Sequence, residues 1–139
     1  MVELHWLAIF LAAASTMVIG SIWYGPLFGE KWQKLAKIKP DKNYTPKKAV
    51  ILYGGAFLAS FLTAMVIAYV AFVANRFFHN SFLQDAVVVS VVLWLGFTAA
   101  RLYMHDSFEG RSRELTLLNI GHEFVTIVVM ATIIGLFPQ

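Results

Sequence analysis

The chain has 139 residues, of which 59% are hydrophobic and 14% are charged, whereas soluble domains carry about a quarter charged residues. This composition argues against a water-soluble globule. The net charge of +3 comes from basic residues in short segments beside apolar stretches, which indicates anionic lipid headgroups rather than nucleic acid as partners. Because the sequence has no cysteine, disulfides, thiolate metal sites and cysteine nucleophiles are excluded.

Four apolar stretches are each long enough to cross a bilayer as a helix, which takes about 20 residues. They lie at residues 4–24, 49–74, 85–103 and 115–137. Helices are expected rather than strands, because a lone strand in lipid would leave its backbone hydrogen bonds unmade. The sequence therefore predicts an all-α fold, an integral membrane four-helix bundle that forms a single domain over residues 1–139. No room is left for a separate catalytic domain.

Small residues recur at every fourth position in the first two predicted spans. The two ladders are Ala8, Ala12, Thr16, Gly20 and Ala56, Ser60, Ala64, Ala68. Residues four apart share one side of a helix, and small side chains there let another helix approach closely. The ladders predict helix-packing faces, either between these two spans or between copies of the chain. The aromatic residues at the ends of the first span, such as Tyr24 and Trp32, fit an interfacial belt.

A basic segment at residues 30–48 follows the first span and holds seven lysines. Trp32, Leu35 and Ile38 recur every three residues within it, and Pro40 is expected to end a helix there. This pattern predicts a short amphipathic helix in the headgroup layer, with its lysines against anionic lipids. A solvated basic loop beside the membrane is the alternative, and lysines alone do not decide between them.

Ten of the eleven basic residues fall on one side of the predicted bundle. Seven lie in the basic segment, and Arg101, Arg111 and Arg113 lie at the end of the third span and in the loop after it. The opposite side has Arg76. Because short loops rich in Lys and Arg stay in the cytoplasm, the sequence predicts a multi-pass protein of the cell membrane with both termini outside.

The fourth predicted span is the most polar, since it contains Asn119, His122 and Glu123. An unpaired carboxylate at Glu123, roughly 12 Å along the helix, would cost several kcal/mol, so it is expected to be protonated, paired or facing a polar cavity. His122 is expected to point about 100° away from Glu123 and to face a different partner. Two interpretations remain: a carboxyl that pins helix packing through Asn119 or the first span, or a site for a proton, ion or substrate.

A second group of ionisable residues surrounds the hairpin before the fourth span. It comprises Arg101, His105, Asp106, Glu109 and Arg111. Arg101 is expected to extend to the interface or to reach Asp106 or Glu109. The spacing of the hairpin residues with His122 matches no established zinc pattern, so neither a metal nor a cofactor is expected. A charged connecting turn is the main interpretation, and an interfacial enzyme acting on a lipid or isoprenoid is the minor one.

Several motifs together resemble a known family. They are Trp23-Tyr24-Gly25-Pro26-Leu27-Phe28-Gly29 with Trp32, then Gly96-Phe97, Phe108-Glu109-Gly110-Arg111, Asn119-x-Gly121 and Met130. In this order they are similar to small four-helix bacterial membrane proteins known only as a domain of unknown function. The resemblance covers nearly the whole chain. It implies the fold and a bacterial inner membrane location, and it brings no established activity.

The motifs include no phosphate-binding glycine loop and no hydrolase order of Ser, His and Asp. The sequence therefore predicts a non-enzymatic protein, an oligomeric or accessory subunit of a membrane complex whose ladders bind other transmembrane helices. A second copy and a different protein are both open as partners. The alternative is a small oligomeric transporter or proton-coupled carrier in which Glu123 titrates. Four helices are few for a complete pathway, so this alternative also requires assembly.

Overall fold

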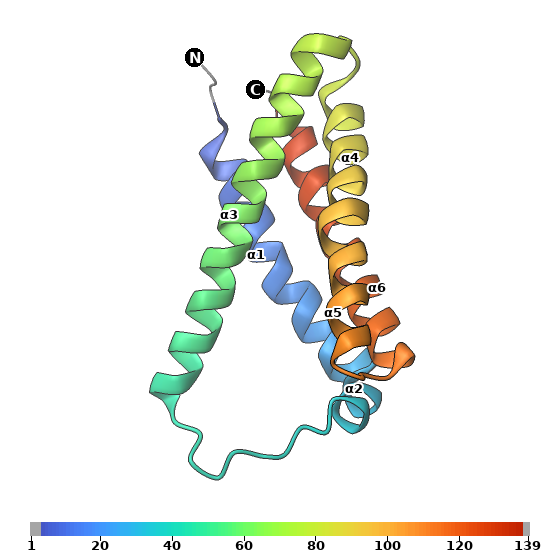
Figure 1. Cartoon of the computed structure of the whole chain (residues 1–139). Coiled ribbons are helices and arrows are strands. Elements are labelled where there is room, and N and C mark those ends of the chain that lie inside the picture. Colours follow the sequence, from blue (N-terminus) through green and yellow to red (C-terminus); the bar gives the residue numbers. More distant parts are fainter. Residues whose placement is uncertain (1–3, 138–139) are drawn as a thin grey trace.

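The computed structural model describes residues 4–137, and within that range it is built from helices without strands (Figure 1). Four helical rods are long and apolar enough to cross a membrane: Trp6–Leu27, Pro46–Phe78, Phe82–Phe108 and Arg113–Leu136. The all-α prediction and the four apolar helices are confirmed. The second and third rods extend beyond the predicted bounds at both ends, because capping residues rather than hydropathy decide where these helices begin.

Two of the rods are interrupted by π-helical turns. The first rod consists of α1 (Trp6–Ile22) and η1 (Trp23–Leu27), and it is followed by the short helix α2 (Gly29–Leu35). The second rod is α3 (Pro46–Phe78). The third consists of α4 (Phe82–Leu93), η2 (Trp94–Ala99) and α5 (Ala100–Phe108), and the last is α6 (Arg113–Leu136). Both interruptions contact the same stretch of α6, as described below.

Side-chain caps set the start of the later helices. Thr45, Ser81 and Ser112 each accept a hydrogen bond from the backbone N–H three residues on, and thereby satisfy one of the free donors at the N-termini of α3, α4 and α6. Pro46 is the first residue of α3, where its missing N–H costs nothing. At the other end of α3, His79 closes the helix in the left-handed conformation, with φ of 57°.

The core lies where α1, α3 and α6 converge, near the end of the bundle at which α1 begins and α6 ends (Figure 1). Ile9, Ile67, Met130 and Ile134 are its largest fully buried apolar side chains. They come from three different rods. Packing of these side chains therefore holds the first, second and fourth rods together at one end of the molecule.

The predicted ladders lie partly in this core. Ala8, Ala12, Ala64 and Ala68 are fully buried, and α1 packs on α3 along them. Their small side chains allow the close approach that the pattern predicted. The rest of each ladder is different, because α1 and α3 diverge toward the end where α2 lies (Figure 1).

Thr16 and Ser60 form the contact at which the two helices begin to separate, with their hydroxyl oxygens 2.9 Å apart. Beyond this contact Ala56 is exposed. Gly20 faces α6 rather than α3, since a Cβ added there would lie 3.7 Å from Nε2 of His122. The two ladders therefore pack on each other only at one end. At the other end the ladder of α1 faces α6, and the ladder of α3 is exposed.

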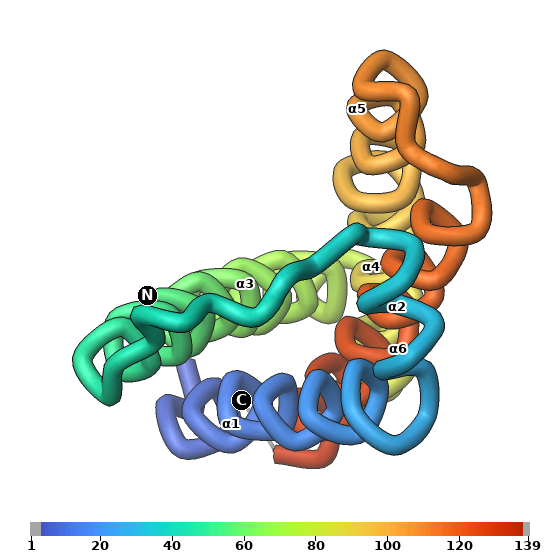
Figure 2. Tube along the Cα trace, turned by 90° about the horizontal axis from the view of Figure 1, so that it is seen from below, coloured from blue at the N-terminus to red at the C-terminus, as the bar shows by residue number. Residues whose placement is uncertain are grey.

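The prediction of a helix in the basic segment is right only at its start. α2 ends at Leu35, well before Pro40, because Lys37 takes the left-handed conformation with φ of 53°. The N–H of Ile38 then donates to the carbonyl of Gln33, which closes the helix end. The remaining chain runs as a loop to Pro46, and Figure 2 shows it crossing from α2 to the start of α3.

Candidate functional site

A groove with a volume of about 860 Å³ lies between α1, α3 and α6, where α1 and α3 diverge. Leu52 and Tyr53 line it from α3 and remain 60% and 61% exposed, so the groove is open on that side. Its serine and threonine lining residues come from every rod of the bundle: Thr16, Ser21, Ser60, Thr63, Thr98 and Thr126. Small-molecule sites commonly have 300–1,000 Å³. The size and mixed lining suit a small ligand.

His122 and Glu123 both line this groove from α6. Nδ1 of His122 lies 3.3 Å from Oε1 of Glu123, and the two side chains are 12% and 42% exposed. The expectation that the two side chains point away from each other is therefore wrong. The helical angle of 100° describes the Cα–Cβ directions, whereas two methylenes let the Glu123 carboxylate fold back beside its neighbour's ring.

His122 is held from several directions. Its Nε2 lies 3.4 Å from Oγ1 of Thr126, one turn along α6. Its ring lies 4.7 Å from the ring of Tyr24 and 6.0 Å from that of Trp23, measured between centroids. On the α1 side, the absence of a side chain at Gly20 leaves room for the ring. The imidazole therefore fills the junction between α1, η1 and α6, with one nitrogen toward Glu123.

Tyr24 joins three elements at this junction. Its hydroxyl donates a hydrogen bond of 2.8 Å to Oδ1 of Asn119, and its ring lies 4.8 Å from the ring of Trp32 on α2. Tyr24 reaches α6 because the rod bends at η1. Gly25 has non-helical torsions there (φ −110°, ψ −105°), and Pro26 lacks the N–H that an unbroken helix would use. The predicted membrane-interface aromatics Tyr24 and Trp32 thus line the groove.

The second π-helix contacts α6 on another side of the same stretch. Nε1 of Trp94 donates to the backbone carbonyl of Ile120 at 3.3 Å, and the Trp94 ring packs on Phe124 at 4.8 Å. Thr98, from the same turn, lines the groove. Single π-turns within α-helices are frequent at functional sites. Here both of them meet α6, the helix that carries Asn119, His122 and Glu123.

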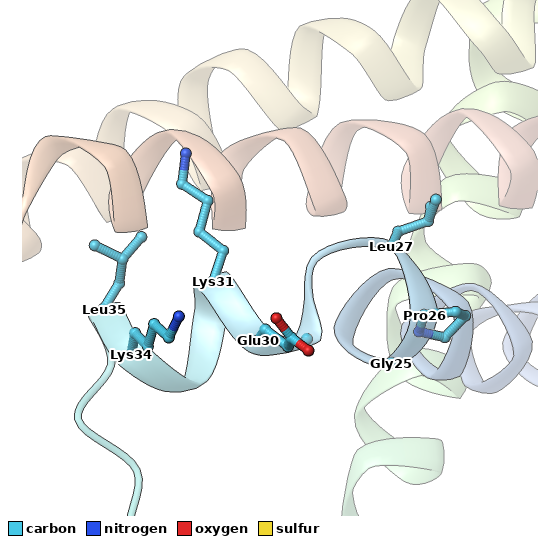
Figure 3. Close-up of a pocket in the computed structure, with 8 residues that line it drawn as sticks. Gly25, Pro26, Leu27, Glu30, Lys31, Lys34 and Leu35 are labelled. Carbon is cyan, nitrogen blue, oxygen red and sulfur yellow. The ribbon is translucent and has the colours of Figure 1, made fainter.

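A smaller hollow of about 690 Å³ lies beside α2 (Figure 3). Figure 3 shows Lys31 extending toward α6, where Nζ lies 3.2 Å from Oε2 of Glu114. Both of these side chains are more than half exposed, so the ion pair contributes at most about 1 kcal/mol. Glu30 and Lys34 lie along the same hollow. The other residues that line this hollow are apolar or glycine.

The hairpin charges are only partly brought together. Asp106 is buried and accepts a hydrogen bond of 2.8 Å from the hydroxyl of Thr116. Nε of Arg111 lies 3.8 Å from Asp106 and 2.7 Å from Glu109. Arg111 rather than Arg101 is thus the basic partner of both acids. The cluster ties α5 to α6 and lies outside the groove.

The other two hairpin residues stand apart. Arg101 is exposed, with its guanidinium 4.0 Å from the sulfur of Met104, and His105 is exposed as well. Within residues 4–137 the structure brings no three His, Cys, Asp or Glu side chains together as a group that could hold a metal ion.

Sequence reasoning missed one buried acid. Asp85 is 4% exposed and accepts hydrogen bonds from the side-chain amides of Asn75 (2.8 Å) and Asn80 (3.0 Å). These bonds close the hairpin between α3 and α4. The sequence does place two asparagines at five-residue intervals before this aspartate. That spacing is compatible with a buried carboxylate whose hydrogen bonds come from nearby side-chain amides. This site stabilises a turn and does not belong to the groove.

A family model described as a protein of unknown function (DUF1761) matches residues 7–135. This match confirms the resemblance seen in the motifs, and it spans every helix that lines the groove. No curated protein and no solved structure matches the chain.

Proposed function

The chain belongs to the DUF1761 family of proteins of unknown function, and we propose that it is a membrane carrier that binds a small solute in the groove and exchanges it for protons. One observation supports this proposal above others: the partly exposed Glu123 carboxylate faces a groove within a rod apolar enough to span a membrane. An ionisable group at that depth is costly unless it serves a polar pathway or a partner. The protein would act without catalysing a reaction.

The contact between His122 and Glu123 gives the groove a proton-handling pair. Histidine is the side chain whose charge ordinarily changes nearest neutral pH, and here its Nδ1 lies 3.3 Å from the Glu123 carboxylate. Solute and proton would compete for the Glu123 carboxylate, so that binding of one favours release of the other. The surrounding contacts from Tyr24 and Thr126 hold the imidazole in place for this exchange.

We further propose that the groove opens toward the cytoplasm of a bacterium, with the protein in its inner membrane and both termini outside. The support is the distribution of basic residues, because ten of eleven lie at the end of the bundle that carries α2 and the α5–α6 hairpin. Trp32, Leu52 and Tyr53 line the groove at this same end. The lysines around α2 would then contact anionic headgroups.

The experiment is a proton-exchange assay in proteoliposomes that contain a pH indicator. Sets of cationic, anionic and neutral small solutes are added separately, and the change in internal pH is followed. We expect a response to at least one set, lost in Glu123→Gln and retained in Glu114→Gln. Glu114 is a matched control, because it is an acid on the same helix that pairs with Lys31 outside the groove. Silence of the unmodified protein with all three sets contradicts the carrier proposal.

A second candidate function is an oligomeric or accessory subunit, and the third rod favours it. Only 11% of the most apolar stretch of Phe82–Phe108 is buried, compared with 33% in Arg113–Leu136. Val92, Leu95 and Phe97 are more than 60% exposed along that rod. Within a membrane this face meets lipid chains, a helix of a second copy or a helix of another protein. Native mass spectrometry after gentle extraction tests the idea, and a bare monomer would contradict it.

A further inference from the structure

We infer that the solute of this groove is an amphiphilic organic cation. The inference rests on the proposed carrier function and adds the chemical class of the ligand. It follows from three properties of the lining: an acid that pairs with no Lys or Arg, aromatic rings near that acid, and flexible apolar side chains around both.

The charge of the lining is the first property. Glu123 lines the groove with 42% of its side chain exposed, and of the described residues that line it none is Lys or Arg. Within residues 4–137, Glu123 pairs with no Lys or Arg, and the ionisable side chain in contact with it is that of His122. A carboxylate in a low-dielectric site attracts a cation strongly and repels an anion. An anionic solute would have no Lys or Arg here to bind.

The aromatic rings are the second property. Tyr24 and Trp32 lie 4.8 Å apart between ring centroids, and both line the groove together with Tyr53 from α3. The faces of such rings attract cations, most strongly where water is excluded. Tyr24 also lies against His122, beside the acid. A cation near Glu123 therefore has rings within the same groove, supplied by η1, α2 and α3.

The apolar part of the lining is the third property. Met17 and Met130 line the groove from α1 and α6, and Leu52 and Ile127 add branched aliphatic surface. Methionine is flexible and polarisable, so it adapts to apolar groups of different shapes. The hydroxyls of Thr16, Ser21 and Thr63 already donate to backbone carbonyls of their own helices, so they offer a solute acceptor oxygens, which suit a cation. A cation with an apolar body matches this surface.

The experiment measures binding of tetraphenylphosphonium and tetraphenylborate to the purified protein in detergent by equilibrium dialysis against empty micelles. The two probes have nearly the same shape and opposite charge, so partition into detergent is controlled. We expect saturable binding of tetraphenylphosphonium to the unmodified protein. Tetraphenylborate should bind no better to the protein than to micelles.

The variants locate the site. Glu123→Gln should weaken tetraphenylphosphonium binding by about tenfold or more, and Trp32→Leu by about threefold. Glu114→Gln should leave it unchanged, because Glu114 lies outside the groove. Gel filtration and thermal unfolding of each variant separate lost binding from lost folding. Equal loss in Glu114→Gln would show a surface charge effect and would overturn the inference.

The outcomes also distinguish the inference from the proposal on which it rests. If proteoliposomes respond to anionic or neutral solutes and not to cations, the proposed carrier function is supported and the inferred positive charge of the solute is wrong. If tetraphenylborate binds as tightly as tetraphenylphosphonium, the groove is a binding site without the proposed charge selection. If neither probe binds and no solute set changes internal pH, both proposals fail.

Discussion

The hydroxyl of Tyr24 donates a hydrogen bond of 2.8 Å to the side-chain oxygen of Asn119, across 95 residues of sequence. This bond fixes the end of the first rod against the polar stretch of the last. The ring that carries the hydroxyl lies against His122 and Trp32, so the same bond also positions two lining residues of the groove.

Replacing Tyr24 with Phe should lower stability by about 1–3 kcal/mol, because the variant leaves the Asn119 oxygen without its donor in a partly buried position. Thermal unfolding in detergent, followed by tryptophan fluorescence, measures the change. Tyr69→Phe is the matched control, since Tyr69 is 51% exposed on α3. Equal effects of the two substitutions would show that the Tyr24–Asn119 bond contributes nothing specific.

Gly135 lies where α6 packs closely on α4. A Cβ added at Gly135 would lie 2.6 Å from the Cα of Leu83, so Gly135→Ala must push the two helices apart and should cost about 1–3 kcal/mol. Gly54→Ala should be neutral or stabilising by up to about 1 kcal/mol, because it meets nothing within 4 Å and favours the helix. Chemical unfolding of both variants checks the contrast. A stable Gly135→Ala protein would show that α4 moves freely.

The hydroxyl of Thr116 donates a hydrogen bond to the buried Asp106. Loss of this bond should lower the stability of the protein more than loss of an exposed charge. Thr116→Val removes that hydrogen bond and should destabilise the α5–α6 hairpin by about 1.5–3 kcal/mol. Glu109→Gln should cost at most about 1 kcal/mol, since Glu109 and Arg111 are both at least half exposed. Hydrogen exchange at the α5–α6 connection gives a local measure. Greater exchange in Glu109→Gln than in Thr116→Val would reverse our assignment of the anchoring residue.

The orientation can be tested with single cysteines, because the native chain has none. Cysteines at Asn43 and Gln84 should react with a membrane-impermeant reagent from opposite sides, Asn43 from the cytoplasm. Gln84 is preferable to Asn80, whose side chain donates to Asp85 and holds its turn. Labelling of both positions in intact cells would be incompatible with the proposed topology.

The fold could be predicted from the sequence to the level of four apolar helices, because hydropathy and the cost of an unmade backbone hydrogen bond leave few other arrangements. The helix ends were less predictable. The end of α2 depends on Lys37 adopting a left-handed conformation, and the conformational preferences of lysine do not predict this. Ala56 shows a second limit, since its place in a regular ladder did not reveal that α1 and α3 separate before it.

The candidate site was predictable in its composition but not in its geometry. Asn119, His122 and Glu123 attract attention as polar groups in an apolar span, and all three lie at the junction with η1 or in the groove. The contact of His122 with Glu123 was missed because helical angles ignore side-chain flexibility. The contribution of Tyr24 depends on the bend at Gly25, which is a tertiary feature.

The π-helix η2 also sets the rotational phase of everything that follows it in the third rod. A π-turn holds one residue more than an α-turn, so it absorbs one extra residue without changing the directions of the side chains that follow. If η2 became an ordinary α-helix with the same number of residues, α5 would rotate by about 100° relative to α4, Asp106 would turn away from Thr116, and another side chain would meet α6 in its place. The π-turn near the middle of the rod thus decides which side of α5 is buried.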